Sequence, residues 1–205
     1  MSDDTTPDTT PDTTPKPIVH FCHGLESGPF GFKSRKLSDS FQVVAPDMQM
    51  SLWNPFLQNS LMRNLVFRLR VPSLSLAMGD SFSGCLTVQR LSLSSSASAL
   101  VGSSWGGAVG AALVAEGSHS GPFVLLCPAI RQRERGAGAD ATRPGLRAAS
   151  IEEGLRALPA PVKARGLIVH GTEDKTVPID DSRALSALTG IELVEVEGGT
   201  HGLGE

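Results

Sequence analysis

This 205-residue sequence has few cysteines, no long apolar run and no large excess of charge of either sign. The three cysteines, Cys22, Cys85 and Cys127, lie far apart and form no Cys-x-x-Cys pair, so the sequence suggests neither a disulfide framework nor a zinc site. Lysine and arginine (18) nearly balance aspartate and glutamate (21), which gives no reason to expect nucleic acid or an anionic membrane as partner. No apolar run is long enough to span a bilayer.

The N-terminal residues 1–16 repeat Thr-Thr-Pro-Asp and contain neither the basic nor the apolar region of a signal peptide. A tract of this composition buries no apolar surface, so we expect it to be disordered. With 40% hydrophobic residues, 17–205 is expected to form one globular domain. The cytoplasm is the expected compartment, because the cysteines resemble buried thiols of a reducing environment.

Short apolar runs that end in Gly, Pro or Asp alternate with helical stretches along this domain. Strands are expected over 18–22, 42–45, the short apolar run that begins at Ala99, 123–127, 166–169 and 191–196, and helices over 32–40, 56–70, 85–93, 105–116, 151–158 and 180–188. Ser150 and Glu153 have capping-box spacing at the start of one of these helices. Strands separated by helices predict an α/β fold with a mostly parallel sheet of about six strands and helices on both faces.

One stretch, ALVGSSWGGAVG from Ala99 to Gly110, has the strand, turn and helix context of a nucleophile elbow. A sharp, strained turn that exposes a serine hydroxyl leaves no space for side chains two residues before and two residues after it. Gly102 and Gly106 meet this requirement around Ser104. A Gly-x-Ser-x-Gly pentapeptide is common, so on this motif alone a glycine-rich structural turn is an equal alternative.

Three further polar segments follow predicted strands, and the carboxyl ends of parallel strands meet at one edge of a sheet. They are His23 to Gly28, His170 to Asp174, and Gly198 to His201. The order serine, acid, histidine is that of α/β-hydrolases and differs from the orders of the two other common serine hydrolase folds.

The segments HGLESGPFG, GSSWGG, HGTEDKTVP and GGTHG, in this order and spacing, resemble the α/β-hydrolase superfamily, and most closely its small, cap-poor YqiA-like esterase branch. The resemblance covers residues 17–202 and implies a fold with a minimal cap or none. It assigns Ser104 as nucleophile, Asp174 as acid and His201 as base, with the backbone N–H groups of Leu25 and Trp105 as oxyanion hole. A small ester or thioester is the implied substrate, and neither a cofactor nor a metal is expected.

The other histidines have other expected roles. His20 and His23 are three residues apart on a strand, so they point to opposite faces and cannot share a metal. We expect His20 in the core, His23 shaping the oxyanion loop, and His170 in a structural role. His119 is expected on the surface at the opposite end of the elbow helix. Glu173 is an alternative acid, but the spacing of the family motif favours Asp174.

Several features leave alternatives open. The two tryptophans, Trp53 and Trp105, are candidates for a pocket or for the core. The arginines of 131–135, with Arg143 and Arg147, are read as a solvated loop in preference to an anion-binding cap. Only four residues follow His201 in the sequence, so the sequence leaves open how firmly this histidine is held. A thioesterase, a peptidase and a non-catalytic binding or interaction protein of the same fold remain alternatives to an esterase.

Overall fold

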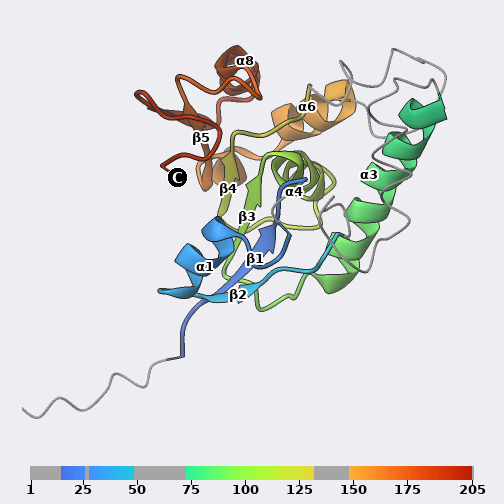
Figure 1. Ribbon diagram of the computed structural model, residues 1–205, viewed down its shortest axis with the longest axis vertical. Helices are drawn as coiled ribbons and strands as arrows, with labels where there is room; N and C mark the ends of the chain where they lie inside the picture. Colours follow the sequence, from blue (N-terminus) through green and yellow to red (C-terminus); the bar gives the residue numbers. More distant parts are fainter. Residues whose placement is uncertain (1–14, 26–27, 49–72, 132–147, 205) are drawn as a thin grey trace, which may run out of the picture.

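The computed structural model describes residues 15–25, 28–48, 73–131 and 148–204, in which strands and helices alternate (Figure 1). The elements in chain order are β1 (Ile18–Cys22), α1 (Phe32–Ser38), β2 (Gln42–Val44), α3 (Ser73–Ser92), β3 (Ala99–Ser103), α4 (Trp105–Ala115), β4 (Phe123–Leu126), α6 (Ala148–Ala157), α7 (Ala160–Lys163), β5 (Gly166–Gly171), α8 (Ile179–Thr189) and β6 (Glu192–Val196).

The six strands form one sheet in the order β2-β1-β3-β4-β5-β6, and every neighbouring pair is parallel. The predicted parallel α/β architecture is therefore confirmed. From β1 the chain adds β2 on one side and then β3 on the other, so the direction of winding reverses between β1 and β3. At such a switch point the loops that leave the two strands diverge and open a crevice at the carboxyl edge.

Alternating strand residues pack against helices on the two faces of the sheet. On one face Val19, Phe21 and Val101 form a small cluster with Leu37 and Phe41 from α1 and its following turn. On the other face the main core joins residues of the sheet to residues of α3, α4, α6 and α8. Figure 1 shows this division, with α1 on one side of the sheet and α3 and α4 on the other.

Helix α4 is buried on all sides, which its composition of glycine, alanine and valine permits. Every residue from Trp105 to Val114 is buried. A Cβ atom at Gly110 would lie 2.9 Å from a methyl group of Leu100, so the glycine lets the helix lie directly on β3. This packing places the first turn of α4 at the carboxyl edge of the central strands.

Helix α3 begins at Ser73, twelve residues before the predicted start at Cys85. Its side chains Phe82, Cys85, Leu86 and Gln89 are all buried, at the spacing of one helical face. The serines and glycines of this segment are weak helix formers, so the helix depends on packing that local sequence does not show.

Helix α6 begins at Ala148, so the predicted capping box at Ser150 is wrong. Ala148, Ile151 and Leu155 are all buried on one face, and Ser150 lies within the helix. Glu153 pairs with Arg156 instead of returning to the backbone of Ser150.

Some predictions lie outside the described residues, namely the disordered tail over 1–14, the helix over 56–70, and Trp53, Arg133, Arg135, Arg143 and Arg147. Among the described residues, no helix is long and apolar enough to cross a membrane.

Candidate functional site

Ser104 lies between the end of β3 and the start of α4 and has a strained backbone, with φ 56° and ψ −117°. The two glycines at the predicted spacing have the predicted cause. A Cβ at Gly106 would overlap the carbonyl groups of Cys22 and His23 at the end of β1, and a Cβ at Gly102 would lie 2.5 Å from the Gly106 carbonyl oxygen. Close packing of one backbone segment against another therefore fixes the turn, at the switch point of the sheet.

Two backbone hydrogen bonds connect the elbow to β4 and to the segment that directly follows β4. The N–H of Ser104 donates to the carbonyl of Leu126 (2.8 Å), and the carbonyl of Ser104 accepts from the N–H of Ala129 (3.0 Å). Together with the glycine contacts, they hold the Ser104 hydroxyl in one position above the sheet.

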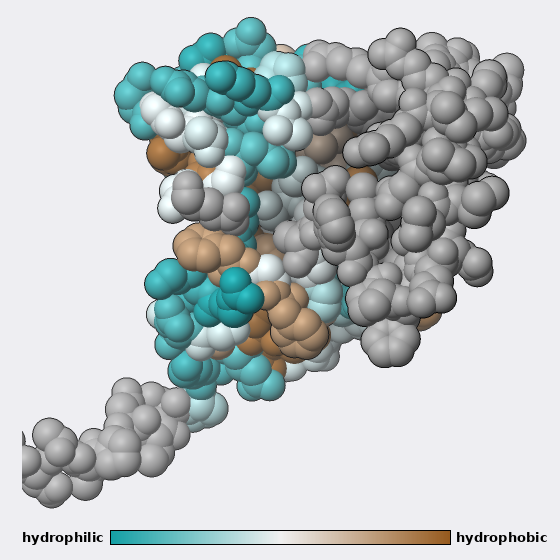
Figure 2. Space-filling view, in the orientation of Figure 1, coloured by the Kyte–Doolittle hydropathy of each residue, from teal (hydrophilic) through white to brown (hydrophobic). Residues whose placement is uncertain are grey.

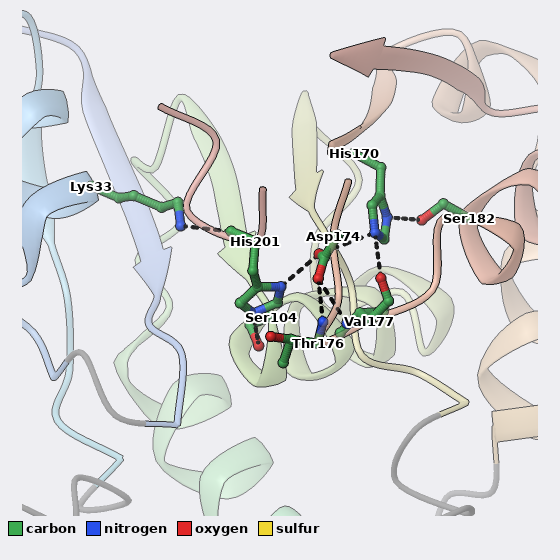
Figure 3. A network of polar contacts seen from close by, with 8 residues as sticks. All are labelled: Lys33, Ser104, His170, Asp174, Thr176, Val177, Ser182 and His201. Atoms are coloured by element: carbon green, nitrogen blue, oxygen red, sulfur yellow. Dashed lines mark hydrogen bonds and ion pairs between the residues drawn. The ribbon is translucent and has the colours of Figure 1, made fainter. Parts of the chain in front are cut away.

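The hydroxyl of Ser104 meets His201, and His201 meets Asp174 (Figure 3). The Ser104 Oγ atom lies 2.9 Å from His201 Nε2, and His201 Nδ1 lies 2.7 Å from Asp174 Oδ2. A carboxylate accepts only, so Nδ1 carries the hydrogen and Nε2 of the neutral ring is free to accept the serine proton. The three residues that the sequence singled out are thus brought together in one hydrogen-bonded line.

The Asp174 side chain is fully buried, at 0% exposed, and follows β5 in a tight turn. Its Oδ1 atom accepts hydrogen bonds from the backbone N–H groups of Thr176 (2.8 Å) and Val177 (2.9 Å). Burial by itself raises the pKa of this carboxyl, but the N–H groups of Val177 and Thr176 and the His201 ring outweigh burial, so the pKa lies below its ordinary value. Asp174 is therefore the charged partner of His201.

The loop that carries His201 is tied to the neighbouring loop after β5. The N–H of Gly198 donates to the Thr172 hydroxyl (2.9 Å), and the N–H of Glu173 donates to the Gly199 carbonyl (2.9 Å). Lys33 on α1 reaches the His201 carbonyl across the site, at 3.5 Å. These contacts connect the loop that carries His201 to the loop after β5 and to α1.

The two residues predicted to donate backbone N–H groups to the oxyanion lie in different structural environments. Trp105 is the first residue of α4, so its N–H has no acceptor within the helix. Leu25 is partly buried and packs against the main core, directly before residues 26–27, which lie outside the described residues. The positions of the two N–H groups relative to a bound oxyanion remain a prediction.

The four histidines other than His201 are all buried. His23 is held by two hydrogen bonds, because its Nδ1 atom lies 2.8 Å from the Gly24 carbonyl and its Nε2 atom accepts from the N–H of Met48 (3.0 Å). Burial lowers the pKa of His23, which keeps the ring neutral beside the loop after β1. His20 contacts Gln89 in the core (2.7 Å), as expected. His119 bonds to the carbonyl of Pro122 and is only 8% exposed, so its expected surface position is wrong.

Packing of the described residues bears on three of the open alternatives. The Trp105 side chain is 4% exposed and packs edge-on against Phe82 with ring centroids 5.5 Å apart, so it belongs to the core. Arg131 pairs with Glu152 at 2.6 Å, which fits a structural reading of this arginine. Glu173 is exposed and only its backbone joins the site, whereas the Asp174 carboxylate contacts His201.

Sequence reasoning missed the surroundings of Asp174. The side chains of Cys127 and His170 are buried behind the carboxylate, and ligand atoms of all three residues lie within 4.8 Å of one another. Burial, and then the charge of Asp174, raise the pKa of the Cys127 thiol to about 12, so it is an uncharged neighbour. A signal was present in the sequence, since both residues stand at strand ends beside the predicted acid.

No family model matches the sequence, and no curated protein matches it. Solved structures with the same fold do match. A candidate hydrolase of the alpha/beta superfamily from Xanthomonas campestris pv. campestris is 22% identical, with 92% of this chain and 90% of that chain covered and a TM-score of 0.53. TT1662 from Thermus thermophilus is 17% identical, with 92% and 83% covered and a TM-score of 0.67.

A serine hydrolase from the bacterium Cycloclasticus zankles is 14% identical, with 91% of this chain and 83% of that chain covered and a TM-score of 0.55. Identities at this level show a common fold and nothing finer. Taken with the all-parallel sheet of six strands, they show that this chain has the α/β-hydrolase fold.

Proposed function

We propose that this protein is a serine hydrolase that cleaves a small ester or thioester through an acyl-enzyme on Ser104. One observation carries the proposal, namely the hydrogen-bonded line from Ser104 Oγ through His201 to Asp174 at a strained strand-to-helix turn. Backbone strain of this kind is costly and persists where the surrounding structure enforces it. The hydrolase fold of the chain agrees with this reading.

In the proposed reaction His201 removes the Ser104 proton through Nε2 while the serine oxygen attacks the substrate carbonyl carbon. Asp174 holds the Nδ1–H tautomer and stabilises the positive charge that the ring acquires. The protonated ring then gives its proton to the departing alcohol or thiol, which leaves an acylated serine. Water, deprotonated by the same ring, attacks the acyl group and releases the acid and the free serine.

Negative charge develops on the substrate oxygen in both halves of this reaction. The N–H groups of Trp105 and Leu25 are the proposed donors to this oxygen. Trp105 begins a buried helix of eleven residues, so its N–H adds the favourable field of a helix N-terminus. Loss of one such donor typically slows turnover about a hundredfold or more.

Two exposed apolar side chains lie on the segment of Lys33, which contacts the His201 carbonyl, and we propose them as contacts for an apolar acyl group. Phe30 is 82% exposed and Phe32 is 41% exposed, and both flank the turn that leads to Lys33, which contacts the His201 loop. Figure 2 shows apolar surface beside α1, interleaved with hydrophilic surface. With the minimal cap that the sequence motifs imply, and with the YqiA-like branch as the proposed relative, we expect short acyl chains to be preferred over long ones.

The proposal is tested with nitrophenyl esters of increasing chain length and with acyl-CoA thioesters. Hydrolysis is measured for the native chain, for Ser104→Ala, and for Ser103→Ala as a matched control, because Ser103 is the neighbouring serine and is 5% exposed in β3. Turnover that is lost in Ser104→Ala and kept in Ser103→Ala is expected. Folded protein with no Ser104-dependent turnover would favour the alternative of a non-catalytic binding or interaction protein, and faster turnover of long chains would contradict the expected preference.

A further inference from the structure

Asp174 contacts two histidines. His201 approaches its Oδ2 atom from the site, with Nδ1 at 2.7 Å, and His170 approaches the same oxygen from the interior, with Nε2 at 3.2 Å. Both the His170 and the Asp174 side chains are 0% exposed. Figure 3 shows the carboxylate between the two rings.

The contacts of His170 fix its tautomer. Its Nε2 atom lies 3.0 Å from the Val177 carbonyl, and its Nδ1 atom lies 2.7 Å from the Ser182 hydroxyl on α8. A carbonyl oxygen accepts only, so Nε2 carries the hydrogen and donates it to Val177, while the same nitrogen lies 3.2 Å from Asp174 Oδ2. The neutral ring then accepts the hydroxyl hydrogen of Ser182 at Nδ1.

These hydrogen bonds form a closed network around the turn after β5. Val177 donates its N–H to Asp174 Oδ1 and receives the His170 N–H at its carbonyl, so one imidazole holds both the carboxylate and the residue that caps it. A buried polar network with every member paired is rigid. Rotation of the Asp174 carboxylate would break contacts at both of its oxygens.

We infer that His170 is a positioning residue, which holds the Asp174 carboxylate from behind in the orientation that His201 needs. The inference rests on the proposed function of Ser104, His201 and Asp174. His170 touches no reacting group, and its ring is separated from His201 by Asp174 itself (Figure 3).

Metal binding is the competing interpretation of Cys127, His170 and Asp174, because their ligand atoms lie close together. The hydrogen bonds argue against it. Both nitrogens of His170 and both oxygens of Asp174 already have partners inside the protein, and the Cys127 thiol is kept protonated by burial. A metal would have to displace these partners, whereas the positioning role uses them as they stand.

The test compares His170→Leu, which removes the N–H, with His170→Gln, whose amide N–H reaches the position of Nε2. Ser182→Ala provides a milder variant that leaves the ring in place without its orienting partner. His20→Leu and His20→Gln are matched controls, because His20 is an equally buried histidine of the sheet, at 1% exposed, with its contact in the core.

For His170→Leu we expect kcat to fall between about tenfold and a hundredfold, the scale of a displaced catalytic group, with KM unchanged. His170→Gln should recover most of the loss, and Ser182→Ala should show a smaller fall of the same kind. In an Asp174→Asn background the change at His170 should have little further effect on kcat. Equal losses in both backgrounds, or the same loss in His20→Leu, would overturn the inference.

A second readout does not depend on turnover. The titration of the His201 ring is followed by NMR in Ser104→Ala protein, with and without His170→Leu. We expect a shift of the His201 midpoint that disappears when Asp174 is also replaced by asparagine. An unchanged His201 midpoint would overturn the inference, whereas absence of Ser104-dependent hydrolysis would count against the proposed function and leave this titration decisive for His170.

Discussion

The elbow that carries Ser104 and the two loops that carry Asp174 and His201 meet at one edge of the sheet, yet different contacts fix them. At the elbow, glycines allow backbone to touch backbone, and the Ser104 conformation follows from the lack of space. At the acid and base loops, side chains and N–H groups hold one another by hydrogen bonds. Steric contact tolerates no added atom and is indifferent to pH, whereas a hydrogen-bonded carboxylate depends on its charge.

The largest expected effect comes from an added methyl group at the elbow. Gly106→Ala would force a Cβ into the carbonyl groups of Cys22 and His23, which are backbone and cannot move aside. We expect a loss of more than about 3 kcal/mol in the free energy of unfolding, or no folded protein at all. Denaturant unfolding measures the loss, with Gly84→Ala on α3 as control, because a Cβ there meets nothing within 4 Å. A stable Gly106→Ala protein would show that the elbow is not sterically fixed.

The next effect is on rate alone. Ser104→Ala and His201→Ala should each lower kcat by roughly 10⁶-fold and Asp174→Asn by roughly 10⁴-fold, the pattern of residues that act as a unit. Circular dichroism should show the native fold in all three variants. If the double variant of Ser104 and His201 lost much more activity than either single variant, the two residues would act independently and the proposed line would be wrong.

A smaller effect is expected on stability, and it distinguishes the contribution of the Asp174 charge from that of the side-chain shape. Asp174→Ala removes the acceptor of the Thr176 and Val177 N–H groups, and should destabilise the fold by about 1–3 kcal/mol at pH 7. Asp174→Asn keeps one oxygen and should lose less.

The pKa of Asp174 is lower in the folded protein than its ordinary 3.8, so the contribution of its charge is present above that pH. The stability difference between the native protein and Asp174→Ala should therefore shrink as the pH falls below about 3.8, through the depressed pKa. Urea unfolding between pH 2.5 and pH 7 follows the difference. A difference that stays constant with pH would mean that the carboxylate charge contributes nothing.

The smallest expected effect concerns the tie between the two loops. Thr172→Val removes the hydroxyl that accepts the Gly198 N–H, whereas Thr172→Ser keeps it. A loss of about 0.5–1.5 kcal/mol is expected for valine only, with a modest fall in kcat because the His201 loop is held less firmly. A valine variant as stable as the native protein would contradict this role of the hydroxyl, and a loss in the serine variant would measure the separate contribution of the methyl group.

The same contrast explains which features the sequence could predict. The elbow is local, because glycine spacing around Ser104 follows from steric needs within five residues, and its prediction agrees with the structure. The meeting of Ser104, Asp174 and His201 follows from the rule that the carboxyl ends of parallel strands share one edge of the sheet. These predictions need no knowledge of distant partners.

The features that the sequence did not predict depend on contacts between residues that lie far apart in the chain. The network of hydrogen bonds around Asp174 joins His170 to Val177 and to Ser182 on α8, and nothing in the local pattern identifies these pairs. Ala148 belongs to the buried face of α6 and lies in the helix before Ser150, which a capping pattern at Ser150 cannot show. The surface assignment of His119 failed for a similar reason, because its bond to Pro122 comes from the turn after α4.

The most direct test of Ser104 as nucleophile uses a fluorophosphonate, which forms an adduct that turnover does not remove. The native chain, Ser104→Ala and Ser103→Ala are treated, and the modified residue is located by peptide mass spectrometry. One adduct, on Ser104, is expected in the native chain and in Ser103→Ala, and none is expected in Ser104→Ala. A well-folded native chain that stays unlabelled, or a label that persists in Ser104→Ala, would contradict Ser104 as nucleophile.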